Sequence, residues 1–264
     1  FSSEIWGHQT LDSVERVHLL ACKRFLGVPV CTPNKLVYGE LGRYPLYVNC
    51  YIRCIKYWFR LLHLNENRLP NQAYRMLVNL DENGKDCWAT KIRHILSNAG
   101  FYSVWLFQGV GNERLFLNLL KQRLIDIFTQ DWFAAINDKD RYNTYRSFKT
   151  VFEPEKYLSD IDVYCFRVAL TQLRLGVLPI NNNLNRYSEC PNRRNCVICT
   201  DHVENEHHFL YVCPLYTDLR NRFIKPISIS LKCVLNSNNS AMHNRSVSKF
   251  IHYAFNRRKY CLDN

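Results

Sequence analysis

The spacing of apolar residues along the chain predicts a series of α-helices. Apolar side chains recur every three or four residues, as on one face of a helix, in 12–27, 45–64, 70–80, 86–100, 112–136, 142–148, 160–176 and 247–260. No alternating run is long enough to build a sheet. The pattern therefore predicts an all-α body that extends to about residue 178.

Two of the predicted helices have an apolar face that a core should bury. In the first helix this face consists of Val14, Val17, Leu20, Ala21 and Phe25. In the longest helix it consists of Leu115, Leu119, Leu120, Leu124, Ile127 and Phe128. Core packing is the simplest explanation of both stripes.

The composition of the chain changes after Pro179. A loop-like run of Asn at 181–183 is followed by a cysteine-rich stretch, and 236–244 is rich in Asn and Ser, as in a linker. The expected organisation has four parts: a helical segment 1–64, a helical connection domain 65–178, a Cys/His module 179–225, and a linker with a basic C-terminal helix 226–264.

The overall composition is that of a folded, basic protein. Of 264 residues, 47% are apolar, which excludes an intrinsically disordered chain. The formal net charge of +12 favours a polyanionic partner. No run of about 18 uncharged apolar residues is present, so no membrane span is expected. No leader segment is visible, which favours an intracellular piece of a longer reading frame.

The twelve cysteines allow two interpretations. A secreted protein would join an even number of cysteines in disulfides. Most of them, however, stand singly in helical patterns, where Cys acts as a small core residue, and only 190–213 concentrates them. We therefore expect a reducing compartment and a metal site, with a secreted disulfide-bonded protein as the alternative.

The concentrated cysteines belong to a motif that predicts a structural zinc ion. The expected ligands are Cys196, Cys199, His208 and Cys213. Two residues separate the first pair and four the second, so both pairs can converge on one tetrahedral ion. His207 competes with His208, and Cys190 is a possible substitute for one of the cysteines. Glu204 and Glu206 offer the carboxylate that a catalytic zinc would need, but nothing else in the sequence indicates hydrolysis.

The stretch beyond the motif is strongly basic. From Pro214 to Asn264 there are nine Lys and Arg residues against two Asp, interleaved with aromatic residues. Cations that bind phosphates and rings that stack on bases are typical of single-strand binding. The candidate contacts to nucleic acid are Arg220, Arg222, Lys225, Arg257, Arg258 and Lys259. An amphipathic helix with a solvated basic face is the simpler alternative.

Several enzyme classes lack their motifs here. The sequence has no Gly-rich phosphate loop, no H-E-x-x-H, no G-x-S-x-G and no two adjacent Asp residues. Metal-dependent polymerases and nucleases need converging carboxylates. We therefore expect that this chain is not an enzyme by itself.

Blocks along most of the chain resemble the C-terminal region of non-LTR (LINE-type) retrotransposon reverse transcriptases. In the N-terminal part these blocks are Glu4–Gly7, Val14–His18, Cys22–Val28, Thr32–Asn34 and Val37–Leu46. In the C-terminal part they are Leu173–Gly176, Cys196–Cys199, Val203–Leu210 and Cys213–Tyr216. The middle of the chain is matched only loosely.

The resemblance implies that this chain is part of a longer protein whose other domains perform the catalysis. The first helices would correspond to the thumb, and the zinc segment would hold RNA or target DNA in the nucleus. The family's His-Phe dipeptide singles out His208 as the ligand. The catalytic palm of this RNA-directed DNA polymerase would lie upstream, so the chain alone should not polymerise DNA.

A rival interpretation is a helical protein–protein interaction module with a structural zinc ion, from a decayed or domesticated element. Exposure of Trp58, Phe59 or Trp132 would favour it, because exposed large apolar side chains mark interaction surfaces.

Overall fold

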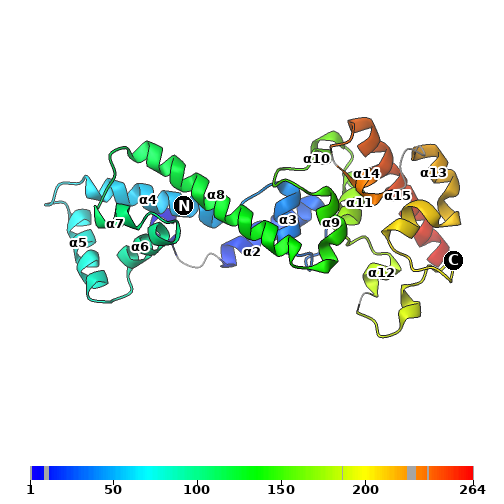
Figure 1. Ribbon diagram of the computed structural model, residues 1–264, viewed down its shortest axis with the longest axis horizontal. Helices are drawn as coiled ribbons and strands as arrows, with labels where there is room; N and C mark the ends of the chain where they lie inside the picture. Colours follow the sequence, from blue (N-terminus) through cyan, green and yellow to red (C-terminus); the bar gives the residue numbers. More distant parts are fainter. Residues whose placement is uncertain (1, 9–11, 186, 225–229, 237, 264) are drawn as a thin grey trace. The chain divides into compact units, whose positions relative to one another are not determined.

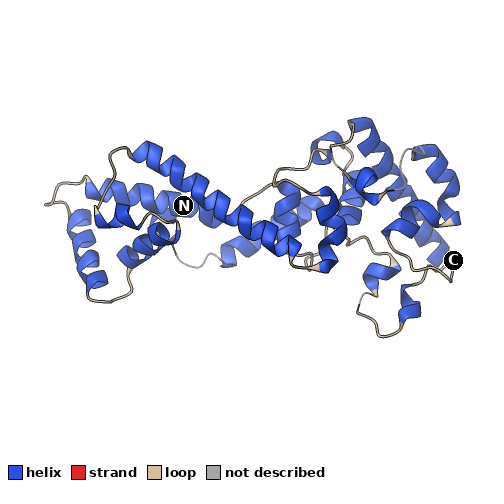
Figure 2. Cartoon of the chain, in the orientation of Figure 1, coloured by secondary structure: helices blue, strands red, loops and turns tan. Residues whose placement is uncertain are grey.

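The computed structural model describes residues 2–8, 12–185, 187–224, 230–236 and 238–263. Within these ranges the chain forms α-helices, short 3₁₀ helices and one π-helical turn. The one strand-like feature in the same ranges is an isolated antiparallel bridge between Asn195 and Val203. Figure 2 shows helices throughout. The predicted all-α fold is confirmed.

The chain divides into two compact units, each made of two separate stretches. Unit 1 consists of Phe1–His18 and Tyr44–Trp132, and unit 2 of Leu19–Arg43 and Phe133–Asn264. The chain passes between the units three times: within α2 (Asp12–Leu26), between Arg43 and Tyr44, and within α8 (Glu113–Asn137). Residues 64 and 178, where domain boundaries were expected, lie inside unit 1 and unit 2 respectively. Segments far apart in the sequence pack into one core, which a local change in composition does not reveal.

Unit 1 contains the helices that the apolar spacing predicts for this part of the chain and two short helices that it does not. Besides parts of α2 and α8, the predicted ones are α4 (Leu46–Leu62), α5 (Leu69–Glu82) and α6 (Trp88–Asn98), and the other two are α1 (Ser3–Trp6) and α7 (Tyr102–Leu106) (Figure 1). Pro45 directly precedes α4, and Pro70 lies in the first turn of α5, where the missing N–H costs nothing.

The core of unit 1 is aromatic. Trp58 stacks on Trp105 with 5.8 Å between ring centroids, and Phe59 meets Phe116 edge to face. The indole N–H of Trp58 donates to the Tyr74 hydroxyl at 2.8 Å, so the polar atom is satisfied in the core. Trp58, Phe59 and Trp132 are all buried, so they do not form the exposed apolar surface that an interaction module would use.

The predicted buried faces of α2 and α8 are wrong in part. In α2, Val17 is 67% exposed, whereas Leu19 and Leu26 are buried. In α8, Leu115 and Leu119 are exposed. The buried stripe of α8 consists of Phe116, Leu120, Leu124, Phe128, Trp132 and Ile136. Both helices carry apolar residues around much of their circumference, so the position of the neighbouring helices decides which side is buried.

Unit 2 contains shorter helices and the C-terminal helix α15 (Ala241–Asp263). The others are α3 (Asn34–Leu41), α9 (Asn143–Phe148), α10 (Tyr157–Asp160), α11 (Tyr164–Arg174), α12 (Asn181–Leu184), α13 (Thr217–Phe223) and α14 (Leu231–Leu235). The linker expected at 236–244 is wrong for its last four residues, because α15 already begins at Ala241.

A buried ionic network lies in unit 2. Arg174 of α11 and Glu40 of α3 form a fully buried pair, with 2.6 Å between Nε and Oε1. Glu155 accepts from Arg174 at 2.5 Å and from Lys149 at 2.6 Å. Two cations therefore balance two carboxylates, which is the condition for keeping charges in a core.

Candidate metal centre

Four side chains of unit 2 converge on one point. The Cys196, Cys199 and Cys213 sulfurs and one ring nitrogen of His208 all lie within 4.8 Å of one another. The Cys213 Sγ atom is 3.9 Å from that of Cys196 and 3.8 Å from that of Cys199. Thiolates bound tetrahedrally at about 2.3 Å from one ion stand about 3.8 Å apart. The cluster can therefore hold a metal ion, on the four residues expected from the sequence.

The first two ligands lie on a tight loop. The backbone N–H of Cys196 donates to the carbonyl of His202 at 2.8 Å, and Thr200 N–H donates to the carbonyl of Cys196 at 2.9 Å. Thr200 has a φ of 50°, in the left-handed region that a non-glycine residue adopts at a cost. The bridge between Asn195 and Val203 closes the loop behind the two sulfurs.

A π-helical turn, His208–Val212, positions the other two ligands. Five residues along an α-helix, at about 100° each, would leave two side chains about 140° apart. Here the N–H of Cys213 donates to the carbonyl of His208 at 2.9 Å, the i→i+5 bond of a wider turn. The wider turn brings His208 and Cys213 towards the same side.

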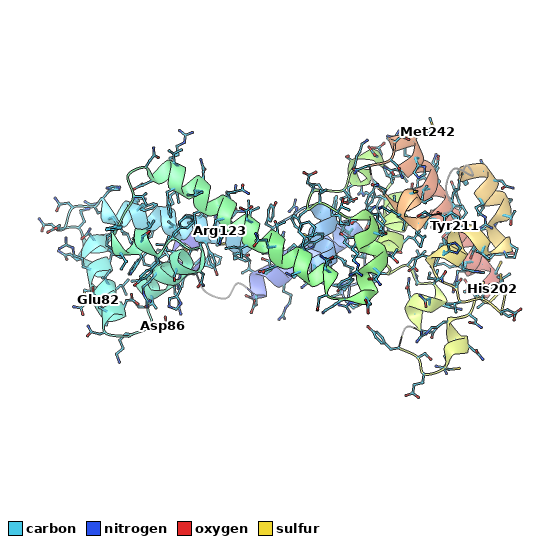
Figure 3. All side chains as sticks on the ribbon, in the orientation of Figure 1. Glu82, Asp86, Arg123, His202, Tyr211 and Met242 are labelled. Atoms are coloured by element: carbon cyan, nitrogen blue, oxygen red, sulfur yellow. The ribbon has the colours of Figure 1, made fainter. Side chains whose placement is uncertain are left out.

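The buried side chain of His208 has ring nitrogens suited to metal binding. Its side chain is 4% exposed, and neither ring nitrogen has a hydrogen-bond partner among the described residues. Burial lowers the pKa of His208, and the neighbouring His202, which is labelled in Figure 3, adds to the shift. The ring is therefore neutral at physiological pH, with a lone pair for a metal ion. A metal ion would satisfy one nitrogen that otherwise stays buried without a partner.

The alternative ligands considered from the sequence lie outside the cluster. Cys190 is exposed, and the exposed His207 packs its ring against Tyr211 with 5.3 Å between centroids. The described cysteines form no disulfide of the kind that the secreted alternative would need. The cluster is thus formed by His208 and three cysteines.

Arg220 supports the metal-binding segment and does not face solvent freely. Its guanidinium donates to the carbonyl of Leu210 at 3.1 Å and to that of Cys213, a ligand residue, at 2.5 Å. Burial lowers the pKa of Arg220. Two of its guanidinium nitrogens thus bind the end of the ligand turn, so Arg220 has a structural role that the sequence did not indicate.

Arg258 is likewise a structural residue. It is 4% exposed and binds both carboxylate oxygens of Glu204, at 2.6 and 2.7 Å. Glu204 also accepts from the backbone N–H of Asn181 at 2.7 Å, and Arg258 donates to the Asn181 side chain at 2.8 Å. Arg258 thus links α15 to the metal-binding segment and is not available to phosphates, contrary to expectation.

The remaining predicted contacts with nucleic acid differ in accessibility. Arg222 and Lys259 are exposed, and their charged groups lie 5.2 Å from the Phe223 ring centroid and 5.0 Å from that of Phe255. Both cations are available to a ligand.

Arg257 is half-buried and makes a bidentate pair with Asp218, with one contact of 2.8 Å. Lys225 lies outside the described residues.

Sequence reasoning missed the structural role of Glu204. Asp201 and Glu206 flank it in the same stretch, so the sequence held no signal that Glu204 would be the buried partner of a distant cation.

Among the described residues, no helix is both long enough and apolar enough to cross a membrane. Comparison of the chain with protein-family models, with curated proteins and with solved structures found no match.

Proposed function

We propose that the cluster binds a structural zinc ion. Three thiolates and one imidazole are a complete donor set for tetrahedral zinc, and such closed sites are structural because no position is left for a reacting water. The sulfur separations of 3.8 and 3.9 Å support this assignment. The zinc ion holds the segment between its two ligand pairs in one conformation.

The zinc-bound segment supports a surface for RNA or DNA, in the C-terminal part of a retrotransposon-type reverse transcriptase. The observation that carries this proposal is the position of the exposed cations: Arg222 on α13 and Lys249 and Lys259 on α15. These helices are the ones that Arg220 and Arg258 link to the metal-binding segment. Cations on a rigid support are suited to a polyanion, because their positions are fixed before binding.

In this proposal the chain binds nucleic acid and a palm domain upstream performs the polymerisation in the nucleus. The resemblance of Val37–Leu46 and of Val203–Leu210 to that family supports the assignment. The sequence contains no adjacent Asp residues of the kind a polymerase palm carries.

Binding to fluorescent single-stranded RNA or DNA should weaken steeply as salt rises. If two or three phosphates are neutralised, the slope of log K against log salt should be about −1.4 to −2.1. Fluorescence anisotropy between 50 and about 200 mM salt measures it. The paired change of Arg222→Gln and Lys259→Gln should flatten the slope, whereas Lys121→Gln in unit 1 should leave it unchanged. Absence of salt-sensitive binding would contradict the proposal.

A further inference from the structure

A groove separates α13 from α15, which lie side by side (Figure 1). It encloses about 420 Å³ and is lined by Leu219, Arg222, Phe223, Lys249, Tyr253 and Arg257. We propose that this groove binds single-stranded nucleic acid by stacking an unpaired base on Tyr253 while the flanking cations bind phosphates. The inference rests on the proposed function and adds to it the kind of strand and the stacking residue.

The spacing of residues on the two helices produces this groove. Lys249, Tyr253 and Arg257 follow at four-residue intervals, so they form one stripe along α15. The stripe on α13 consists of Leu219, Arg222 and Phe223. A different side of α15 is buried, with Phe250, Ile251, Ala254 and Arg258. Arg222, Lys249 and Tyr253 therefore remain exposed at the surface of unit 2, and Leu219 forms the buried floor of the groove.

The aromatic residues of the groove form a parallel stack that is open to solvent. The rings of Phe223 and Tyr253 are 5.6 Å apart and 20° from parallel. The guanidinium of Arg222 lies 5.2 Å from the Phe223 centroid. Phe166 and His252 contact the Tyr253 ring at an angle, at 5.9 and 5.6 Å, but Tyr253 is still 43% exposed, so part of its ring is open to a planar group.

The charges of the groove favour an anion. Asp218 neutralises Arg257 through their bidentate pair. Among the described residues, Arg222 and Lys249 have no carboxylate within salt-bridge distance. Two free cations beside an exposed ring match a nucleotide, which carries a phosphate and a flat base together.

The exposed ring favours a single strand over a duplex. In a duplex each base is already stacked on its neighbours, so an aromatic side chain has no base face to contact. In a single strand the bases are free to stack on protein rings, with little preference for sequence. The phosphates alone would bind in either case through Arg222 and Lys249.

The metal centre fixes both walls of the groove. Arg220 of α13 donates to the carbonyl of the ligand residue Cys213, and Arg258 of α15 binds Glu204 between the ligand pairs. The two helices thus have a common support.

Variants of Tyr253 test the inference in the full chain with zinc bound. Tyr253→Leu should weaken binding to a labelled ten-nucleotide oligo(U) or oligo(dT) by about 5- to 150-fold, the range for loss of one stacked base. Tyr253→Phe should bind within about twofold of the unchanged chain, since the ring remains. Affinity for a ten-base-pair duplex should be unchanged in both variants.

A matched control and two further measurements separate the possible results. Tyr102 of unit 1 is 44% exposed, nearly the same as Tyr253, and Tyr102→Leu should have no effect on binding. Lys249→Gln should weaken single strand and duplex alike and reduce the salt slope by about 0.7 for the single strand. Circular dichroism melting of each variant should match that of the unchanged chain.

Two results would overturn the inference in different ways. If Tyr253→Leu binds the single strand as tightly as the unchanged chain, and binding stays salt-sensitive, the groove does not stack a base while the proposed function stands. If the unchanged chain binds neither strand form, the proposed function fails and the groove inference fails with it. Equal competition by poly-glutamate and oligo(U) would show recognition of charge alone and would also contradict stacking.

Discussion

Replacement of Cys199 by Ser, or of His208 by Ala, is expected to remove the metal ion and unfold about residues 194–223. Structural zinc contributes about 10–16 kcal/mol to folded zinc-finger peptides, whereas whole domains are stable by about 5–15 kcal/mol. The cluster joins the two halves of this segment, whose Phe209, Leu210 and Tyr216 are buried in unit 2. Loss of one ligand should therefore unfold it, while the aromatic core of unit 1 stays folded.

Loss of the metal ion should also affect residues outside 194–223. Arg258 is buried against the Glu204 carboxylate of that segment, so its unfolding removes a partner from α15. A buried cation without its partner is costly, and the end of α15 should loosen. Chelation of the metal ion should have the same consequence as the ligand variants.

Metal analysis and hydrogen exchange measure these outcomes together. The unchanged chain should contain about one zinc ion, and exchange should accelerate in residues 194–223 of the variants but not in α4 or α6. Cys190→Ser and His207→Ala are matched controls, because both residues are exposed and lie outside the cluster. Retention of one zinc ion per chain in both ligand variants would refute the ligand assignment.

Replacement of Arg174 by Met should destabilise unit 2 by about 3–5 kcal/mol. The fully buried guanidinium lies between Glu40 and Glu155, and its removal leaves two buried carboxylates with only Lys149 to balance them. Urea unfolding followed by circular dichroism measures the loss. Arg245→Met is the matched control, because Arg245 is 53% exposed and its ion pair with Asp162 spans 3.5 Å, so about 1 kcal/mol or less is expected.

A double variant separates lost charge balance from lost packing. Adding Glu40→Leu to Arg174→Met removes one charge of each sign and leaves Glu155 paired with Lys149. The double variant should therefore recover about 0.5–3 kcal/mol of the loss, the usual size of coupling between buried neighbours. A double variant less stable than the sum of the two single variants would show that packing, not charge, dominates.

Features encoded by neighbouring residues could be predicted from the sequence. Helices α4, α5, α6 and α8 agree with the apolar spacing to within a few residues, because a helix depends on contacts three or four positions apart. The metal cluster could be predicted for a similar reason: each pair of ligands is held by one short turn. The motif specified the ligand types, and burial selected His208 over its exposed neighbour His207.

Features that depend on distant residues could not be predicted. Val17 and Leu19 of α2 are equally apolar, but only the second faces the core. Arg257 and Arg258 are adjacent in one basic run, and both have carboxylate partners about 40 to 54 positions away along the chain. The pattern of neighbouring residues does not predict such a distant partner.

The sequence by itself determined the helical class, the Cys/His motif and the basic character of the C-terminal part, since each depends on residue type and short spacing. Only the tertiary structure decided which cations are structural and which are free, and it placed Tyr253 beside Phe223 at the surface. The reason is physical. The energy of a charge or a ring depends on burial and on its partners, and both are set by packing between segments far apart in the chain.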